Sequence, residues 1–72
     1  MCGIIGINSN KSVSATIINS LKKLEYRGYD SAGIATLSNG LINEVKSEGR
    51  VDNLEKNSLV QNMEGNIGIG HV

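Results

Sequence analysis

The chain alternates short apolar runs with polar turns, and the spacing of its apolar residues predicts where strands and helices lie. Residues 2–8 are almost continuous isoleucine and glycine, which is typical of a strand buried on both faces. Between residues 12 and 25 the apolar positions recur at helical spacing. Ser12 or Ser14 is the expected cap of this helix, and Gly28 is its expected stop signal.

The middle of the chain predicts a β-hairpin. The polar segment Tyr26–Ala32 is expected to be a loop, and Gly33–Ser38 has the pattern of a strand. Asn39-Gly40 is a strong signal for a two-residue type I′ turn, because that turn needs a positive φ at both central residues. Leu41–Ser47 is then the return strand of the hairpin.

The remaining residues predict a second helix and a last strand. Asp52-x-x-Glu55 fits a capping box, the signature of a helix start. A short apolar face accompanies it, made by Val51, Leu54, Leu59 and Val60. Residues 62–66 are expected to turn, and residues 67–72 repeat the isoleucine–glycine pattern of a strand. The predicted order is β-α-β-β-α-β, an α+β fold in one unit over residues 1–72.

Composition limits both the core and the kinds of partner. The 72 residues make at most one small domain, and a domain of ~60 residues buries only ~60% of its unfolded surface. One cysteine excludes an internal disulfide, and no Cys/His cluster suggests a metal site. The net charge is zero with both signs interspersed, which gives no support for a nucleic-acid or membrane surface. No apolar run reaches the ~18–20 residues of a membrane span and no signal peptide is recognised, so a cytoplasmic location is expected.

Cys2 is the residue that points most directly to chemistry. If Met1 is removed, a thiol and a free α-amine lie on the same residue. The reference pKa is ~8.5 for a free cysteine and ~7.7–8.0 for a terminal amine, so both groups titrate near neutrality. The amine can then act as general base for the neighbouring nucleophile. The alternative is that Cys2 is a small buried hydrophobe without a chemical role.

The segment over residues 26–33 is unusual, because it places a guanidinium, a carboxylate, a hydroxyl and two phenols around two glycines. One interpretation is that Arg27 recognises an anionic group, since arginine binds carboxylates in a planar fork. The other is a solvated loop with a surface ion pair. His71, the only histidine, suggests a Cys–His pair, but we favour a structural role for it because the α-amine already supplies a base.

Two stretches carry a resemblance to a known family. MCGIIGI at residues 1–7 resembles the start of the class II glutamine amidotransferases, which are N-terminal-nucleophile (Ntn) hydrolases. YRGYDSAG at residues 26–33 is more discriminating and resembles one branch of them, the glutamine–fructose-6-phosphate aminotransferases. GIGH at residues 68–71 also fits this branch, so that the resemblance covers essentially the whole chain.

The resemblance implies a role for several residues and a fold. Cys2 would attack the side-chain amide of glutamine and form a γ-glutamyl thioester, with its α-amine as base and then as acid for the departing ammonia. Arg27 would help to position the N-terminus, Gly28 would let the backbone pass close to it, and residues 29–31 would shape the loop. No metal or cofactor is implied. The implied fold is the N-terminal part of a glutamine amidotransferase domain, a partial four-layer αββα Ntn-hydrolase sandwich.

In the complete enzyme of this branch, ammonia would pass to sugar-isomerase domains and convert fructose 6-phosphate to glucosamine 6-phosphate, and a homodimer is expected. Residues 1–72 lack those domains and the Arg-Trp-Ala-Thr-His-Gly block of the family, and Val72 stands where threonine is usual. We therefore expect the main glutamine-binding residues beyond Val72 and no activity of these residues alone. The alternatives are a non-enzymatic piece that associates with a separate chain carrying the rest of the domain, and a stable domain with no surviving role.

Overall fold

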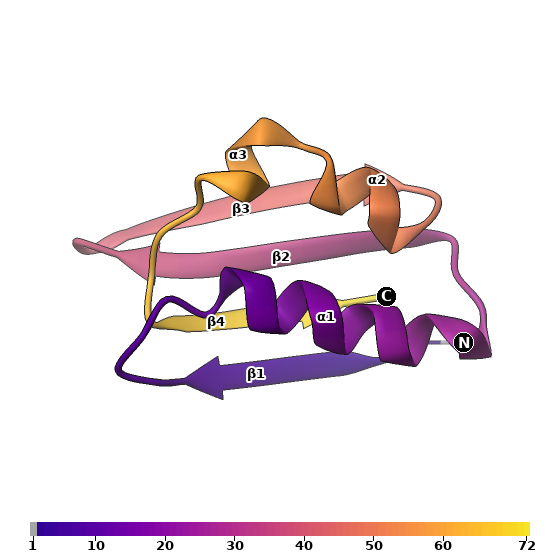
Figure 1. The fold of residues 1–72 in the computed structure, drawn as a ribbon, viewed down its shortest axis with the longest axis horizontal. Coiled ribbons are helices and arrows are strands. Elements are labelled where there is room, and N and C mark those ends of the chain that lie inside the picture. The colour runs from indigo at the N-terminus through magenta and orange to yellow at the C-terminus, as the bar shows by residue number, and fades with distance from the viewer. Residues whose placement is uncertain (1) are drawn as a thin grey trace.

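One antiparallel sheet carries helices on a single face (Figure 1). The computed structural model describes residues 2–72. The elements in chain order are β1 (Ile4–Asn8), α1 (Ser14–Leu24), the 3-10 helix η1 (Glu25–Arg27), β2 (Ser31–Ser38), β3 (Leu41–Glu48), α2 (Val51–Glu55), α3 (Ser58–Gln61) and β4 (Ile67–His71). The predicted α+β class is confirmed. No helix among residues 2–72 has the length and apolar character that a bilayer crossing requires.

The last strand of the sequence lies inside the sheet. The strand order is β1-β4-β2-β3, and every neighbouring pair is antiparallel. His71 of β4 therefore faces Ile4 of β1 on one side and Gly33 of β2 on the other. Because β4 runs against both of its neighbours, the starts of β1 and β2 lie beside the end of β4.

Helix α1 packs closely on β4 because that strand presents glycine to it. Ile17 and Leu21 are fully buried, and both lie against Gly70. A Cβ built on Gly70 would lie 2.5 Å from Ile17 Cγ2, and one on Gly68 would lie 2.9 Å from Ile17 Cδ1. Glycine in β4 thus allows a close approach of helix and strand. The buried core consists of Val13, Ile17, Ile18, Leu21, Ala32, Ile34, Val45, Val51, Leu54, Val60, Met63 and Val72.

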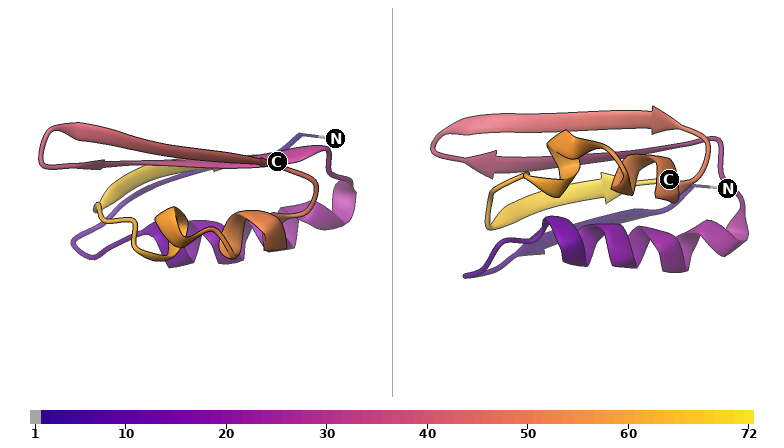
Figure 2. Two further views of the ribbon diagram at one scale, coloured as in Figure 1. Left: turned by 90° about the horizontal axis from the view of Figure 1, so that it is seen from above. Right: turned by 45° about the horizontal axis from the view of Figure 1, so that its top comes forward.

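The opposite face of the sheet is uncovered (Figure 2). Ile4 is 83% exposed on it, and Ile42 and Ile69 are 75% and 63% exposed. The prediction that residues 2–8 form a strand buried on both faces is therefore wrong, because β1 is an edge strand with helices on one side only. The described residues form one helical layer and one sheet, and the four-layer αββα arrangement stays a prediction.

The predicted hairpin turn and the predicted helix stop at Gly28 are both confirmed. Asn39 and Gly40 join β2 to β3 with φ angles of 53° and 77°. Gly28 ends η1 with a φ of 116°. The loop predicted over residues 26–32 is shorter than expected, because η1 takes up its beginning and β2 takes up its end.

The predicted serine cap of α1 is wrong. Val13 occupies the N-cap position, and no side-chain hydrogen bond caps the helix there. The Ser14 hydroxyl donates to the Met63 carbonyl oxygen at 3.4 Å, and the Val13 N–H donates to the Gly65 carbonyl oxygen at 3.0 Å. The start of α1 is thus held by the segment before β4, a long-range contact that the local pattern does not contain.

The predicted capping box of the second helix is also wrong. Helix α2 begins at Val51, one residue before Asp52, and Arg50 occupies the N-cap position without a side-chain cap. The carboxylate of Glu25 accepts the Val51 N–H at 2.7 Å. The segment expected to form one helix is divided in two, and Asn57 caps the second part, α3.

Candidate active site

Cys2 lies in a pocket of about 400 Å³ at the end of the sheet where β1 and β2 start and β4 ends. The pocket is lined by Cys2, Gly28, Tyr29, Asp30, Ser31, His71 and Val72. Its volume falls within the ~300–1,000 Å³ typical of small-molecule sites. Three segments that are far apart in the sequence therefore meet around the only thiol of the chain.

Backbone pairing brings Cys2 and Val72 to the same place. The Gly3 N–H donates to the Val72 carbonyl oxygen at 3.1 Å, and the Val72 N–H donates to the Gly3 carbonyl oxygen at 3.0 Å. These bonds continue the β1–β4 ladder beyond its Ile4–His71 pair. Cys2 thus directly precedes a hydrogen-bonded ladder, which fixes where its backbone lies.

The thiol of Cys2 is free and exposed. Exposure counts against the alternative that Cys2 is a small buried hydrophobe, because reactive cysteines are partly accessible whereas structural ones are buried. Met1, whose removal would free the α-amine of Cys2, lies outside the described residues.

The segment Gly28–Ser31 enters the pocket because η1 ends abruptly at Gly28. The Gly28 N–H donates to the Glu25 carbonyl oxygen at 2.9 Å, and the φ of 116° is one that glycine adopts at little cost. The chain then turns from η1 toward the start of β2. Arg27, the last residue of η1, is exposed and is not among the residues that line the pocket, so its role at the N-terminus stays a prediction.

His71 lines the pocket as well, although sequence reasoning favoured a structural role for it. Gly33, its neighbour on β2, leaves the space that the imidazole occupies, since a Cβ there would collide with His71 Nε2. Strand register is the signal that sequence reasoning lacked. Ile4 pairs with His71, and strand alternation places Cys2, two residues before Ile4, on the same face.

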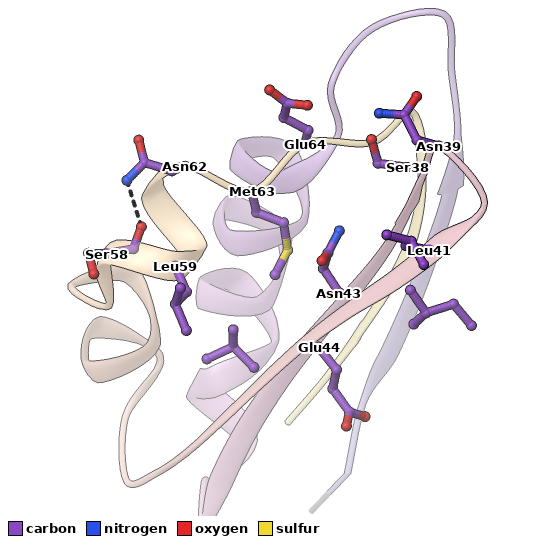
Figure 3. Close-up of a pocket in the computed structure, with 12 residues that line it drawn as sticks. Ser38, Asn39, Leu41, Asn43, Glu44, Ser58, Leu59, Asn62, Met63 and Glu64 are labelled. Atoms are coloured by element: carbon purple, nitrogen blue, oxygen red, sulfur yellow. Dashed lines mark hydrogen bonds between the residues drawn. The ribbon is translucent and has the colours of Figure 1, made fainter.

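A larger hollow of about 580 Å³ lies between β3 and α3, away from Cys2 (Figure 3). Serine, asparagine and glutamate side chains line it together with Leu41, Leu59 and Met63. Leu59, which the sequence predicts on a buried helix face, is 67% exposed. No cysteine or histidine lines this hollow, so the smaller pocket at Cys2 is the better candidate for covalent chemistry. Among residues 2–72, no group of three His, Cys, Asp or Glu side chains is placed to hold a metal ion.

Sequence comparison identifies relatives of this chain, although no family model matches it. The relatives are curated glutamine–fructose-6-phosphate aminotransferases (isomerizing). The protein of Clostridium acetobutylicum is 56% identical over 72 residues, that of Brucella abortus 55% over 71, and that of Mesorhizobium japonicum 48% over 71. Each match covers 99% of this chain. Over essentially its whole length, the chain is therefore similar to part of the aminotransferases of this name.

These matches confirm the resemblance carried by residues 1–7 and 26–33. The chain spans 12% of the length of the curated relatives that it matches. Their name pairs glutamine with fructose 6-phosphate.

Proposed function

We propose that the Cys2 pocket is the nucleophile end of a glutamine-hydrolysing site of the class II, Ntn-hydrolase type. The observation that carries this proposal is the meeting of the exposed Cys2 thiol with the Gly28–Ser31 segment in one pocket. The relatives, at 48–56% identity, are named for a reaction that uses glutamine. An accessible thiol in a pocket of small-molecule size suits attack on an amide carbonyl.

In the proposed reaction, Cys2 Sγ attacks the side-chain amide carbon of glutamine. The α-amine, free once Met1 is removed, takes the thiol proton and passes it to the departing nitrogen, so that the C–N bond breaks and ammonia leaves. A γ-glutamyl thioester then remains on Cys2. Water adds to the thioester carbonyl, the C–S bond breaks, and glutamate and the free thiol are released.

Arg27 and Gly28 are proposed as supporting residues of this site. Gly28 lines the pocket with a φ of 116°, so the loop passes Cys2 without a side chain at that point. Arg27 precedes it at the end of η1 and is proposed to position the N-terminus. The next three residues form one wall of the pocket.

For the whole protein we propose transfer of the released ammonia to fructose 6-phosphate, giving glucosamine 6-phosphate. This proposal rests on the name of relatives of which the chain spans 12%. The helical layer and the sheet described here would be two layers of a four-layer αββα sandwich, with a second sheet on the exposed face. A cytoplasmic homodimer that needs no cofactor is part of the same proposal.

Residues 1–72 by themselves are expected to turn glutamine over very slowly. The Cys2 thiol is exposed, and the neighbouring sheet face that holds Ile4 and Ile69 is bare, so water is not excluded from the reacting atoms. Mixing the purified chain with glutamine and measuring glutamate tests this expectation. Turnover at the rate of a complete glutaminase domain would overturn it.

The exposed apolar face also favours a second candidate function, a non-enzymatic piece that binds a separate chain carrying the rest of the domain. The experiment is to add the C. acetobutylicum relative from which the matching residues have been deleted. Formation of a stable complex by size-exclusion chromatography with light scattering supports this function. A monomer that unfolds cooperatively and does not bind the added chain argues against it.

The glutaminase proposal is tested by labelling Cys2 with an electrophilic diazoketone analogue of glutamine. We expect the parent chain to be labelled once, at Cys2, and Cys2→Ala to remain unlabelled, because the thiol is the attacking group. Intact-mass spectrometry reads both the label and the removal of Met1. Equal labelling of the parent and Cys2→Ala would refute Cys2 as the nucleophile, and retention of Met1 would rule out the α-amine as base.

A further inference from the structure

The junction between β3 and α2, residues 49–50, contacts the Gly28–Ser31 segment that lines the Cys2 pocket. The Gly49 N–H donates to the Asp30 carbonyl oxygen at 2.8 Å. Arg50 Nη2 donates to Glu25 Oε1 at 3.3 Å. The Arg50 guanidinium also lies over the ring of Tyr29, with Cζ 5.5 Å from the ring centroid. The junction thus contacts η1 and two successive residues that line the pocket.

The carboxylate of Glu25 joins η1 to the junction between β3 and α2. The Glu25 side chain is only 7% exposed and accepts the Val51 N–H at 2.7 Å in addition to the Arg50 guanidinium. A buried carboxylate is costly without such partners, so Glu25 holds the first residues of α2 close to η1. Arg50 itself is 60% exposed, and therefore its orientation is set by Glu25 and Tyr29 rather than by burial.

We propose that Arg50 is a positioning residue of the Cys2 pocket, which holds Tyr29 where it lines the pocket. Arg50 is not among the lining residues, so its effect on the pocket passes through Tyr29. Tyr29 is 47% exposed, and attraction between the guanidinium and the ring face favours one orientation of an otherwise loosely packed side chain. Backbone pairing of Gly49 with Asp30 sets the distance at which this attraction acts.

Three variants test this role in the 72-residue chain. Arg50→Met removes the guanidinium and keeps an apolar stem of similar reach. Arg50→Lys keeps a cation for both Glu25 and Tyr29. Lys56→Met is the matched control, since it removes the same charge at the exposed end of α2. If Arg50→Met does not fold by circular dichroism, Arg50→Gln replaces it under the same criteria.

The deciding quantity is the ratio of two rate constants for Cys2, one with the diazoketone analogue of glutamine and one with iodoacetamide. This readout rests on the proposed glutaminase function. A small displacement of a residue that lines a site can lower the reaction rate strongly. We therefore expect the ratio to fall about tenfold in Arg50→Met, to recover in Arg50→Lys and to be unchanged in Lys56→Met. A fall in thermal midpoint with an unchanged ratio would show a merely structural role and overturn the proposal.

Failure of the glutaminase proposal is distinguishable from failure of this one. If the parent chain shows no preference for the analogue over iodoacetamide beyond that of free N-acetylcysteine, the glutaminase proposal fails. Positioning by Arg50 is then judged by the amide NMR signals of Gly28–Ser31. Shifts in Arg50→Met that are absent from Lys56→Met support it, and signals that match the parent refute it.

Discussion

Gly33 determines where the only histidine of the chain can lie. It faces His71 across the β2–β4 ladder, and the imidazole occupies the space that a larger residue would fill. The same histidine lines the pocket with Cys2. The absence of a side chain at Gly33 on β2 therefore allows His71 on β4 to lie near the Cys2 thiol.

Gly33→Ala is expected to displace the His71 ring and destabilise the fold by about 1 kcal/mol, because the new methyl group would collide with Nε2. The ring signals of this single histidine in proton NMR report the displacement, and urea unfolding reports the stability. Gly6→Ala on the same sheet face is the control, since its Cβ would meet its nearest neighbour at 3.8 Å. Unchanged His71 signals in Gly33→Ala would contradict this account of the pocket.

At the scale of elements, contacts between α1 and the rest of the chain organise the helical layer. Its inner face packs on the glycines of β4, while Lys22 on its outer side reaches α2. Lys22 Nζ donates to Glu55 Oε1 at 2.7 Å and lies 3.8 Å from Asp52 Oδ1. The helix is thus held by close packing on one side and by exposed charges on the other.

Gly70→Ala should weaken the packing of α1 on β4 and lower the free energy of unfolding by about 1–3 kcal/mol. The reason is that the added Cβ would lie 2.5 Å from Ile17 and 3.1 Å from Leu21, both fully buried. Urea denaturation followed by circular dichroism measures the change. Gly6→Ala again serves as control and should stay within about 0.5 kcal/mol of the parent. Equal effects of the two substitutions would show that the close approach does not limit stability.

The contact between α1 and α2 predicts a pH dependence. The hydrogen bond to Glu55 raises the pKa of Lys22 above its ordinary value of 10.5, with Asp52 adding to the effect. A raised pKa contributes stability that is complete below pH 10.5 and is lost as the pH rises through the higher value of the folded state. The stability difference between the parent and Glu55→Gln should therefore be constant near neutrality and shrink at strongly alkaline pH. A difference that grows with alkaline pH would have the wrong sign for this explanation.

At the scale of the whole molecule, burial is one-sided. Helices α1, α2 and α3 lie on one face of the sheet (Figure 2). The other face presents exposed isoleucine and leucine to solvent. The exposed apolar residues on that face are Ile4, Leu37, Ile42, Ile67 and Ile69. Contiguous apolar surfaces of this kind mark interfaces or lead to association.

We expect concentration-dependent self-association of the 72-residue chain through this face. Light scattering should show the mean mass rising with concentration, and the double substitution Ile42→Thr/Ile69→Thr should reduce the rise because it removes two large exposed side chains. Leu59→Thr, which replaces an equally exposed residue on α3, is the control. Association that is insensitive to the double substitution but lost in Leu59→Thr would place the contact on the helical side.

The sequence by itself determined the kind of elements and the resemblance to a known family. Helical spacing predicted α1, and Asn39-Gly40 predicted the hairpin turn, because positive φ is a property of the turn residues themselves. The motifs at residues 1–7 and 26–33 carried that resemblance, which the relatives confirm. All of this information is local in the chain.

Only the tertiary structure decided that β4 lies between β1 and β2 and which face of the sheet is buried. The entry of His71 into the Cys2 pocket follows from the order β1-β4-β2-β3. The capping of α2 by Glu25 and the exposure of one side of β1 follow from where the helices pack. Each depends on contacts between residues at least 25 positions apart. Apolar alternation predicts that a strand has a buried side, but it cannot name the strand that pairs with it, because the pairing energy depends on packing that forms only when the whole sheet assembles.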